Sequence, residues 1–135
     1  MKIAQRVFNA LCVLWAGSLW SLLWVAPVMF HFQSDRHVAG LIAASLFSVE
    51  TYLGFALGVL ALALPHRRRF RLGYFAVALL LLNEWLLKPV MEVARTAGKA
   101  LGLGFGPWHG VSALLYVFAC ILVAIMIFSE ESSHA

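Results

Sequence analysis

The chain has 135 residues, of which 63% are hydrophobic and 12% are charged, and its formal net charge is +4. A soluble domain is usually ~45–50% apolar and ~25% charged, so this chain has too little polar surface to face water. The composition excludes a disordered chain, a disulfide scaffold and a soluble enzyme domain, and it predicts an integral membrane protein in contact with the lipid bilayer. In such a protein the excess of Lys and Arg indicates topology and contact with anionic headgroups, with no nucleic acid as partner.

The first apolar run covers residues 7–30 and contains no charged residue. A helix needs ~20 apolar residues to cross a bilayer, whereas the apolar region of a cleaved signal peptide has only ~7–15. We therefore expect a retained transmembrane helix. A short polar connection at residues 31–37 then leads to a second helix at residues 38–64.

A basic segment at residues 66–71 precedes the third apolar run. The predicted third helix covers residues 72–94 and is bent or ended near Lys88 and Pro89, because proline has no backbone N–H. The glycine-rich residues 102–107 are expected to form a hinge or flexible connection before a fourth helix at residues 108–128. The short connections predict one all-α domain over residues 1–135, an up-and-down bundle of four helices.

The basic residues predict how the bundle is oriented. Six Lys and Arg residues fall on one side of the membrane (residues 2, 6, 67, 68, 69 and 71), and three fall on the other (residues 36, 95 and 99). Basic residues concentrate on the cytoplasmic side. We therefore expect both termini in the cytoplasm.

Three charged residues lie within the predicted helices: Glu50, Glu84 and Lys88. A charge at the bilayer centre costs at least ~2.5–3.5 kcal/mol, so these side chains need partners or water. With a rise of ~1.5 Å per residue, Glu50 lies about 18 Å below the outer face and Glu84 about 12 Å below it. Both carboxyl groups are expected near the middle of the membrane.

The spacing of these residues predicts which way they face. Glu50, Gly54 and Gly58 share one face of the second helix, where small residues allow a neighbouring helix to approach. On the third helix, Glu84 and Lys88 begin a stripe of alternating charge that should face protein or water. The predicted site is a polar cluster in the outer half of the bundle, and its residues are Glu50, Asn83, Glu84, Lys88, His109, Ser112 and Tyr116.

The residues also carry a resemblance to a known family. They include Trp15 and Gly17, the segment LNEWLLKPVME in the third helix and the segment FGPWHGVSALLY at the start of the fourth. With these features the chain resembles the bacterial domain-of-unknown-function family numbered 4149, which is similar to eukaryotic transmembrane protein 205. The resemblance implies a four-helix, multi-pass integral membrane protein of the bacterial inner membrane and assigns no catalytic residue.

Two interpretations of the polar cluster remain open. It is either a buried ion-pair network that fixes how the helices pack, or an outward-facing site for a small solute, ion or proton. The leading hypothesis is a small non-enzymatic membrane protein that handles such a species without a cofactor, as a homo-oligomer or with a membrane-protein partner. The alternatives are a scaffolding subunit and a haem- or copper-binding redox protein with His109 and either His31 or His37 as ligands.

Overall fold

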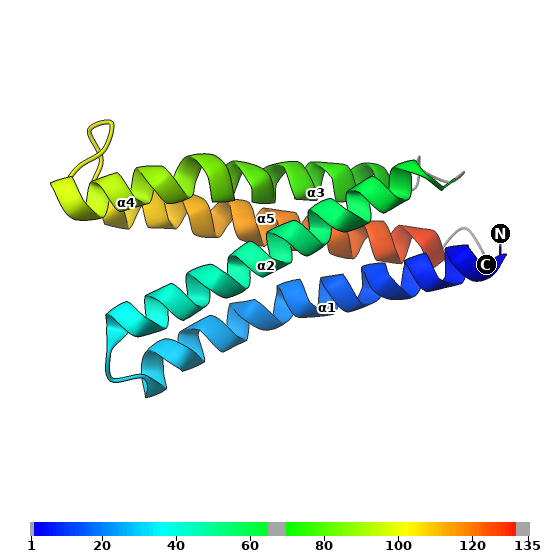
Figure 1. Ribbon diagram of the computed structural model, residues 1–135, viewed down its shortest axis with the longest axis horizontal. Coiled ribbons are helices and arrows are strands. Elements are labelled where there is room, and N and C mark those ends of the chain that lie inside the picture. The colour runs from blue at the N-terminus through cyan, green and yellow to red at the C-terminus, as the bar shows by residue number, and fades with distance from the viewer. Residues whose placement is uncertain (1, 65–69, 132–135) are drawn as a thin grey trace.

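The computed structural model describes residues 2–64 and 70–131, and these residues are almost entirely helical (Figure 1). The elements are α1 (Lys2–Phe32), α2 (Arg36–Leu62), α3 (Arg71–Leu82), the π-helical turn η2 (Asn83–Leu87), α4 (Lys88–Ala97) and α5 (Phe105–Glu131). Within the described ranges, four stretches are long and apolar enough to cross a membrane: Lys2–Phe32, Arg36–Leu62, Arg71–Ala97 and Phe105–Ser129. The predicted all-α, multi-pass membrane fold is confirmed.

The helices form two pairs. Helix α1 packs along α2, and α3 packs most extensively along α5. Figure 1 shows that α1 begins and α5 ends at the same end of the bundle, where the two pairs lie close together. Toward the opposite end, which holds the connections at residues 33–35 and 98–104, the two pairs separate.

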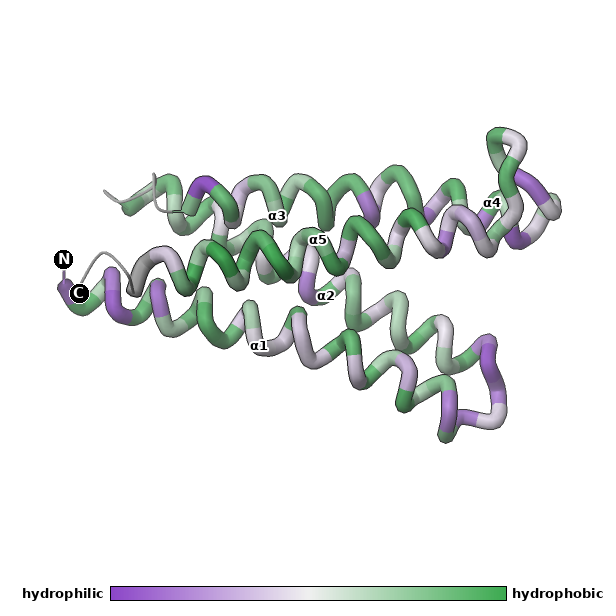
Figure 2. Tube along the Cα trace, turned by 180° about the vertical axis from the view of Figure 1, so that it is seen from behind, coloured by the Kyte–Doolittle hydropathy of each residue, from purple (hydrophilic) through white to green (hydrophobic). Residues whose placement is uncertain are grey.

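The core is built from residues spaced three and four apart, because this spacing places side chains on one face of a helix. On α1 the buried stripe is Phe8, Cys12, Trp15, Leu19 and Leu22. On α5 the buried stripe is Tyr116, Ala119, Cys120, Val123 and Met126. Figure 2 shows hydrophobic residues along most of each helix and hydrophilic residues concentrated toward the ends, as expected for segments that cross a bilayer.

The third transmembrane helix does not end near Lys88, which corrects one of the two sequence-based alternatives. The chain stays helical to Ala97 through the π-helical turn η2, in which the backbone N–H of Lys88 bonds to the carbonyl of Asn83, five residues back. Pro89 follows directly, and because it has no N–H to donate, the backbone hydrogen-bond pattern is interrupted by one bond next to the widened turn. The helix thus accommodates the proline by widening one turn.

The glycine-rich connection is more ordered than predicted. Backbone hydrogen bonds of 2.8 and 3.1 Å join Ala100 and Leu103 across a tight turn, and α5 begins at Phe105, three residues before the predicted start. Pro107 lies in the first turn of α5, a position that proline tolerates. The expectation of a hinge is therefore wrong for residues 105–107.

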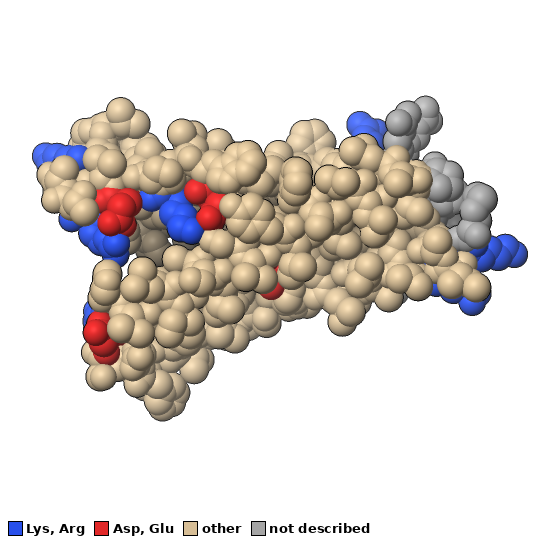
Figure 3. Space-filling model, viewed as in Figure 1, with Lys and Arg blue, Asp and Glu red and all other residues tan. Residues whose placement is uncertain are grey.

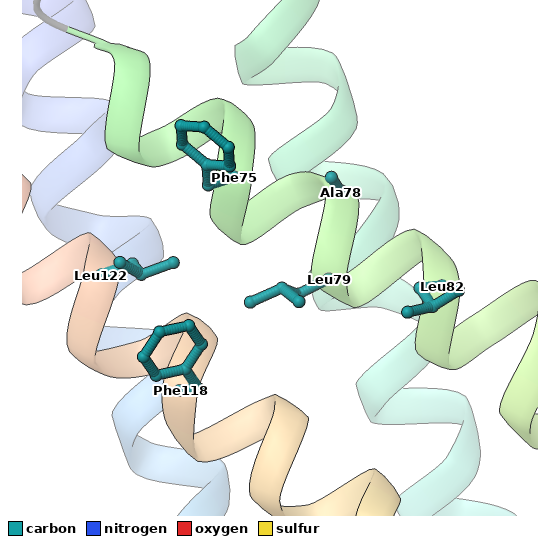
Figure 4. Close-up of a pocket in the computed structure, with 6 residues that line it drawn as sticks. All are labelled: Phe75, Ala78, Leu79, Leu82, Phe118 and Leu122. Carbon is teal, nitrogen blue, oxygen red and sulfur yellow. The ribbon is translucent and has the colours of Figure 1, made fainter.

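A shallow apolar groove runs between α3 and α5 on the outside of the bundle (Figure 4). Its lining residues are Phe75, Ala78, Leu79, Leu82, Phe118 and Leu122. The rings of Phe75 and Phe118 are largely exposed. In a membrane this surface faces lipid, whose acyl chains match its apolar lining.

Candidate functional site

The residues predicted to form one polar cluster are divided in the structure among separate sets of contacts. The central set joins Ser48 of α2 to Glu84 of η2 and Lys88 of α4, and we refer to it as the Ser48 triad. Lys88 Nζ donates to Glu84 Oε1 and to Ser48 Oγ, each at 2.8 Å, and Ser48 Oγ lies 2.8 Å from Glu84 Oε1. The triad connects one helix pair to the other.

The two charged groups of the Ser48 triad differ in exposure. The side chain of Glu84 is 13% exposed, whereas that of Lys88 is 43% exposed. A lysine ammonium has three N–H donors, and the contacts to Glu84 and Ser48 use two of them. The third N–H is available to a polar group that approaches from the open side.

Asn83 and Ser112 form a second contact, between η2 and α5. Ser112 Oγ donates to Asn83 Oδ1 at 2.6 Å, and Asn83 Nδ2 donates to the Ser112 carbonyl at 3.3 Å. The predicted cluster included both Ser112 and Lys88, but Ser112 bonds to Asn83 and not to Lys88. Asn83 and Glu84 are consecutive, so their side chains leave the helix about 100° apart and meet different neighbours.

Tyr116 lies deeper in the core of the bundle. Its hydroxyl donates to the backbone carbonyl of Leu19 on α1 at 2.7 Å, and its ring meets that of Phe47 edge-on at a centroid distance of 4.7 Å. These contacts satisfy the Tyr116 side chain without Glu84, which was predicted to belong to the same cluster. Its place is at the junction of α1, α2 and α5.

Glu50 is also separate from the Ser48 triad. It is 7% exposed and lies on the α2 face that carries Gly54 and Gly58. Ser18 of α1 lies 2.9 Å from Glu50 Oε2, and Trp15 Nε1 donates to the Glu50 backbone carbonyl at 3.2 Å. This contact set belongs to the interface between α1 and α2.

His109 does not join any of these sets. Its side chain stacks on Phe105 of the same helix at 5.6 Å and the residue is exposed. His31 similarly contacts its neighbour Phe32. In the described part of the chain, no three His, Cys, Asp or Glu side chains come together as potential metal ligands.

Sequence reasoning missed three residues that hold the charged groups in place: Ser18, Ser48 and Trp15. Serine and tryptophan are common in transmembrane helices, so their presence alone gives no signal. The spacing of Ser18 could have indicated its position, because residues three apart share one face of a helix and Trp15 lies on the face of α1 that packs on its neighbours. Ser48 gave no such indication, since it lies two residues from Glu50 and points away from it.

The Ser48 triad lies between the two helix pairs, and the side chain of Lys88 is exposed at the molecular surface there. Figure 3 shows that this face is hollowed between the two helix pairs at the end opposite the chain termini, and that acidic and basic side chains gather around the hollow. Helix α4 packs on α5 rather than extensively on α1 or α2, which leaves the space between the pairs open there. The charged residues described at this end are Asp35, Arg36, Glu84, Lys88, Glu92, Arg95 and Lys99.

Comparison with protein-family models matches residues 10–100 to a family described as a domain of unknown function (DUF4149). The match includes Glu50, Glu84 and Lys88, and it ends before His109, Ser112 and Tyr116. No curated protein and no solved structure matches the chain. The similarity to transmembrane protein 205 stays a prediction.

Proposed function

Because the chain belongs to the family described as a domain of unknown function (DUF4149), its role follows from its own residues, and we propose that it binds a small solute or ion at the Ser48 triad. It does so as a small non-enzymatic membrane protein. The hollow between the two helix pairs is the entrance to this site (Figure 3).

The observation that carries this proposal is the exposure of Lys88. A buried ion pair that only fixes helix packing repays its desolvation cost when its geometry is good and its remaining hydrogen bonds are made by the protein. Lys88 instead keeps 43% of its side chain exposed and has one N–H beyond the two that Ser48 and Glu84 occupy. A ligand with an acceptor oxygen, such as a carboxylate or phosphate group, suits that position.

The proposal also assigns a side of the membrane to the site. The hollow lies at the end that carries Arg36, Arg95 and Lys99, and the distribution of basic residues favours the side outside the cytoplasm for this end. Solute would reach the triad from the outer face of a bacterial inner membrane. Binding beside Ser48 would act on the contact that joins the two helix pairs.

The test is thermal unfolding of the purified protein in detergent with a panel of small anions and cations. A ligand at about 100 times its Kd stabilises the folded protein by about 2.7 kcal/mol. We expect at least one ion to raise the melting temperature of the wild-type protein. The double variant Glu84→Gln with Lys88→Met should lose that response.

The matched control is the ion pair between Glu92 and Arg95. Both side chains of this pair are exposed, and the pair lies on the same helix as Lys88. The double variant Glu92→Gln with Arg95→Met should keep the wild-type response. If the Glu84 and Lys88 variant folds and still responds like the wild type, the site does not bind the ligand. A triad with a purely scaffolding role would give that result.

A further inference from the structure

Glu50 has no cationic partner among the residues that the structure describes. Lys88 is engaged with Glu84 and Ser48, and the other described Lys and Arg side chains lie toward the helix ends. An ionised carboxylate that is buried without a cation is very costly, and in a membrane no bulk water offsets that cost. At 7% exposure, Glu50 gains little from solvent.

The elements packed around Glu50 carry only neutral groups toward it. On α1 these are Ser18 and Trp15. On α5, Tyr116 and Cys120 are close enough to interact electrostatically with the carboxyl group. On α3, Tyr74 lies against Gly58, two turns further along α2. Tyrosine and cysteine are ordinarily uncharged at neutral pH, so none of these groups supplies a positive charge that would offset an ionised carboxylate.

The hydrogen bonds of Ser18 distinguish the two protonation states of Glu50. Ser18 Oγ lies 2.9 Å from Glu50 Oε2 and 2.9 Å from the Trp15 carbonyl. A hydroxyl has one proton, so it can donate to only one of these oxygens. If Glu50 is protonated, its O–H donates to Ser18 Oγ and Ser18 donates to the Trp15 carbonyl, so that both contacts are hydrogen bonds at the same time.

With an ionised Glu50 the same geometry is poorly satisfied. Ser18 would donate to the carboxylate and leave its contact with the Trp15 carbonyl without a proton. The carboxylate has about four acceptor positions, and Ser18 is the side chain that donates to it in the described residues. The protonated form uses the observed contacts better.

We infer that Glu50 is a neutral carboxylic acid and that, with Ser18, it forms a proton-binding site near the middle of the membrane, separate from the Ser48 triad. The proton is held on the carboxyl oxygen that faces Ser18. This site lies between α1 and α2, whereas the triad joins α2 to η2 and α4. The two sites therefore share no hydrogen-bond partner in the described residues.

Infrared spectroscopy of the protein in lipid tests this inference. A protonated carboxyl group has a carbonyl stretching band that is resolved from those of ionised carboxylates and that shifts in D₂O. The wild-type protein should show this band at neutral pH, and Glu50→Gln should lose it. Glu84→Gln, the matched control, should retain it, because Glu84 is paired with Lys88.

Two further measurements connect the band to a site that exchanges its proton. Ser18→Ala should shift the band to higher frequency, because the carboxyl group loses its hydrogen-bond acceptor. Raising the pH should replace the band with carboxylate bands. A wild-type spectrum without the band at neutral pH would overturn the inference, and so would a band that Glu50→Gln retains or one that persists at strongly alkaline pH.

Labelling of the wild-type protein with dicyclohexylcarbodiimide gives a result that does not depend on a variant. This lipid-soluble reagent adds to protonated carboxyl groups in apolar surroundings and leaves the whole reagent on the side chain as an N-acylurea. Mass spectrometry should find the added mass on Glu50 and not on Glu84. Labelling of Glu84 in preference to Glu50 would contradict the assignment.

Discussion

Gly54 lies where α2 packs closely against Trp15 of α1. A Cβ atom at this position would overlap the indole ring of Trp15, the residue whose Nε1 donates to the Glu50 carbonyl one turn away. A flexible side chain could yield to an added methyl group, but a rigid indole ring in a packed interface cannot move without its neighbours. The position of the Trp15 ring therefore requires a residue without a side chain at position 54.

Substitution of this glycine tests the packing directly. Gly54→Ala should destabilise the protein by about 1–3 kcal/mol, because an overpacked interface forces the ring and backbone to shift. The measurement is the melting temperature in detergent. The control is Gly17→Ala on α1, where an added Cβ meets no atom within 4 Å.

Alanine is favoured over glycine inside a helix by about 1 kcal/mol, so Gly17→Ala should keep or raise the melting temperature. Equal melting temperatures for Gly54→Ala and the wild type would contradict the close packing of Trp15 on α2.

For single residues, the sequence predicts which charged side chains lie within the membrane but not which side chains form hydrogen bonds with them. The cost of charge in a membrane identified Glu50, Glu84 and Lys88, and glycine spacing placed Glu50 on a helix-facing side. Depth along a helix estimates how far a residue lies from the membrane surface, yet it does not give the direction in which its side chain points. That direction depends on helix rotation, which the sequence pattern alone leaves open.

The connection between α4 and α5 contains three residues with left-handed backbone geometry. Gly98 and Gly102 have positive φ angles, and so does Leu101, at 49°. Positive φ at both central residues is typical of a type I′ turn, which favours Asn and Gly and disfavours a leucine. Trp108 of α5 fastens this turn by donating from Nε1 to the Ala100 carbonyl at 2.8 Å.

Leu101→Asn should therefore stabilise the protein. Left-handed backbone geometry costs an ordinary residue roughly 1–2 kcal/mol, and asparagine relieves part of that cost. Leu101 is 83% exposed, so little packing is lost. Thermal unfolding should show a higher melting temperature for Leu101→Asn and no gain for Leu103→Asn, whose φ is not positive. An equal gain for both variants would contradict this explanation.

The helices themselves could largely be predicted, since each is a long apolar run. Their ends could not: α1 includes Lys2 and Arg6, because long basic side chains reach the headgroups from within a helix. The π-helical turn was also missed. A proline signals a change in the hydrogen-bond pattern, but packing of the helix on both sides decides between a break and a widened turn.

For the molecule as a whole, the shared end of α1 and α5 places the start of the first helix and the end of the last on one side of the membrane (Figure 1). The basic residues favour the cytoplasm for that side. Single cysteines can test this, because the native Cys12 and Cys120 are buried.

Ile3→Cys and Thr96→Cys are suitable positions, since both residues are exposed and neither substitution changes the charge. In sealed right-side-out vesicles a membrane-impermeant maleimide should label the cysteine at position 96. It should label the cysteine at position 3 only after the vesicles are permeabilised. The opposite pattern would reverse the proposed orientation.

The separation of the two helix pairs toward one end gives the molecule the outline of a wedge (Figure 1). A wedge displaces more lipid from the leaflet that surrounds its wide end than from the leaflet around its narrow end. The bilayer can relieve this imbalance by bending, with the leaflet at the wide end on the convex side. With the orientation proposed above, the protein would fit best where the membrane bulges away from the cytoplasm.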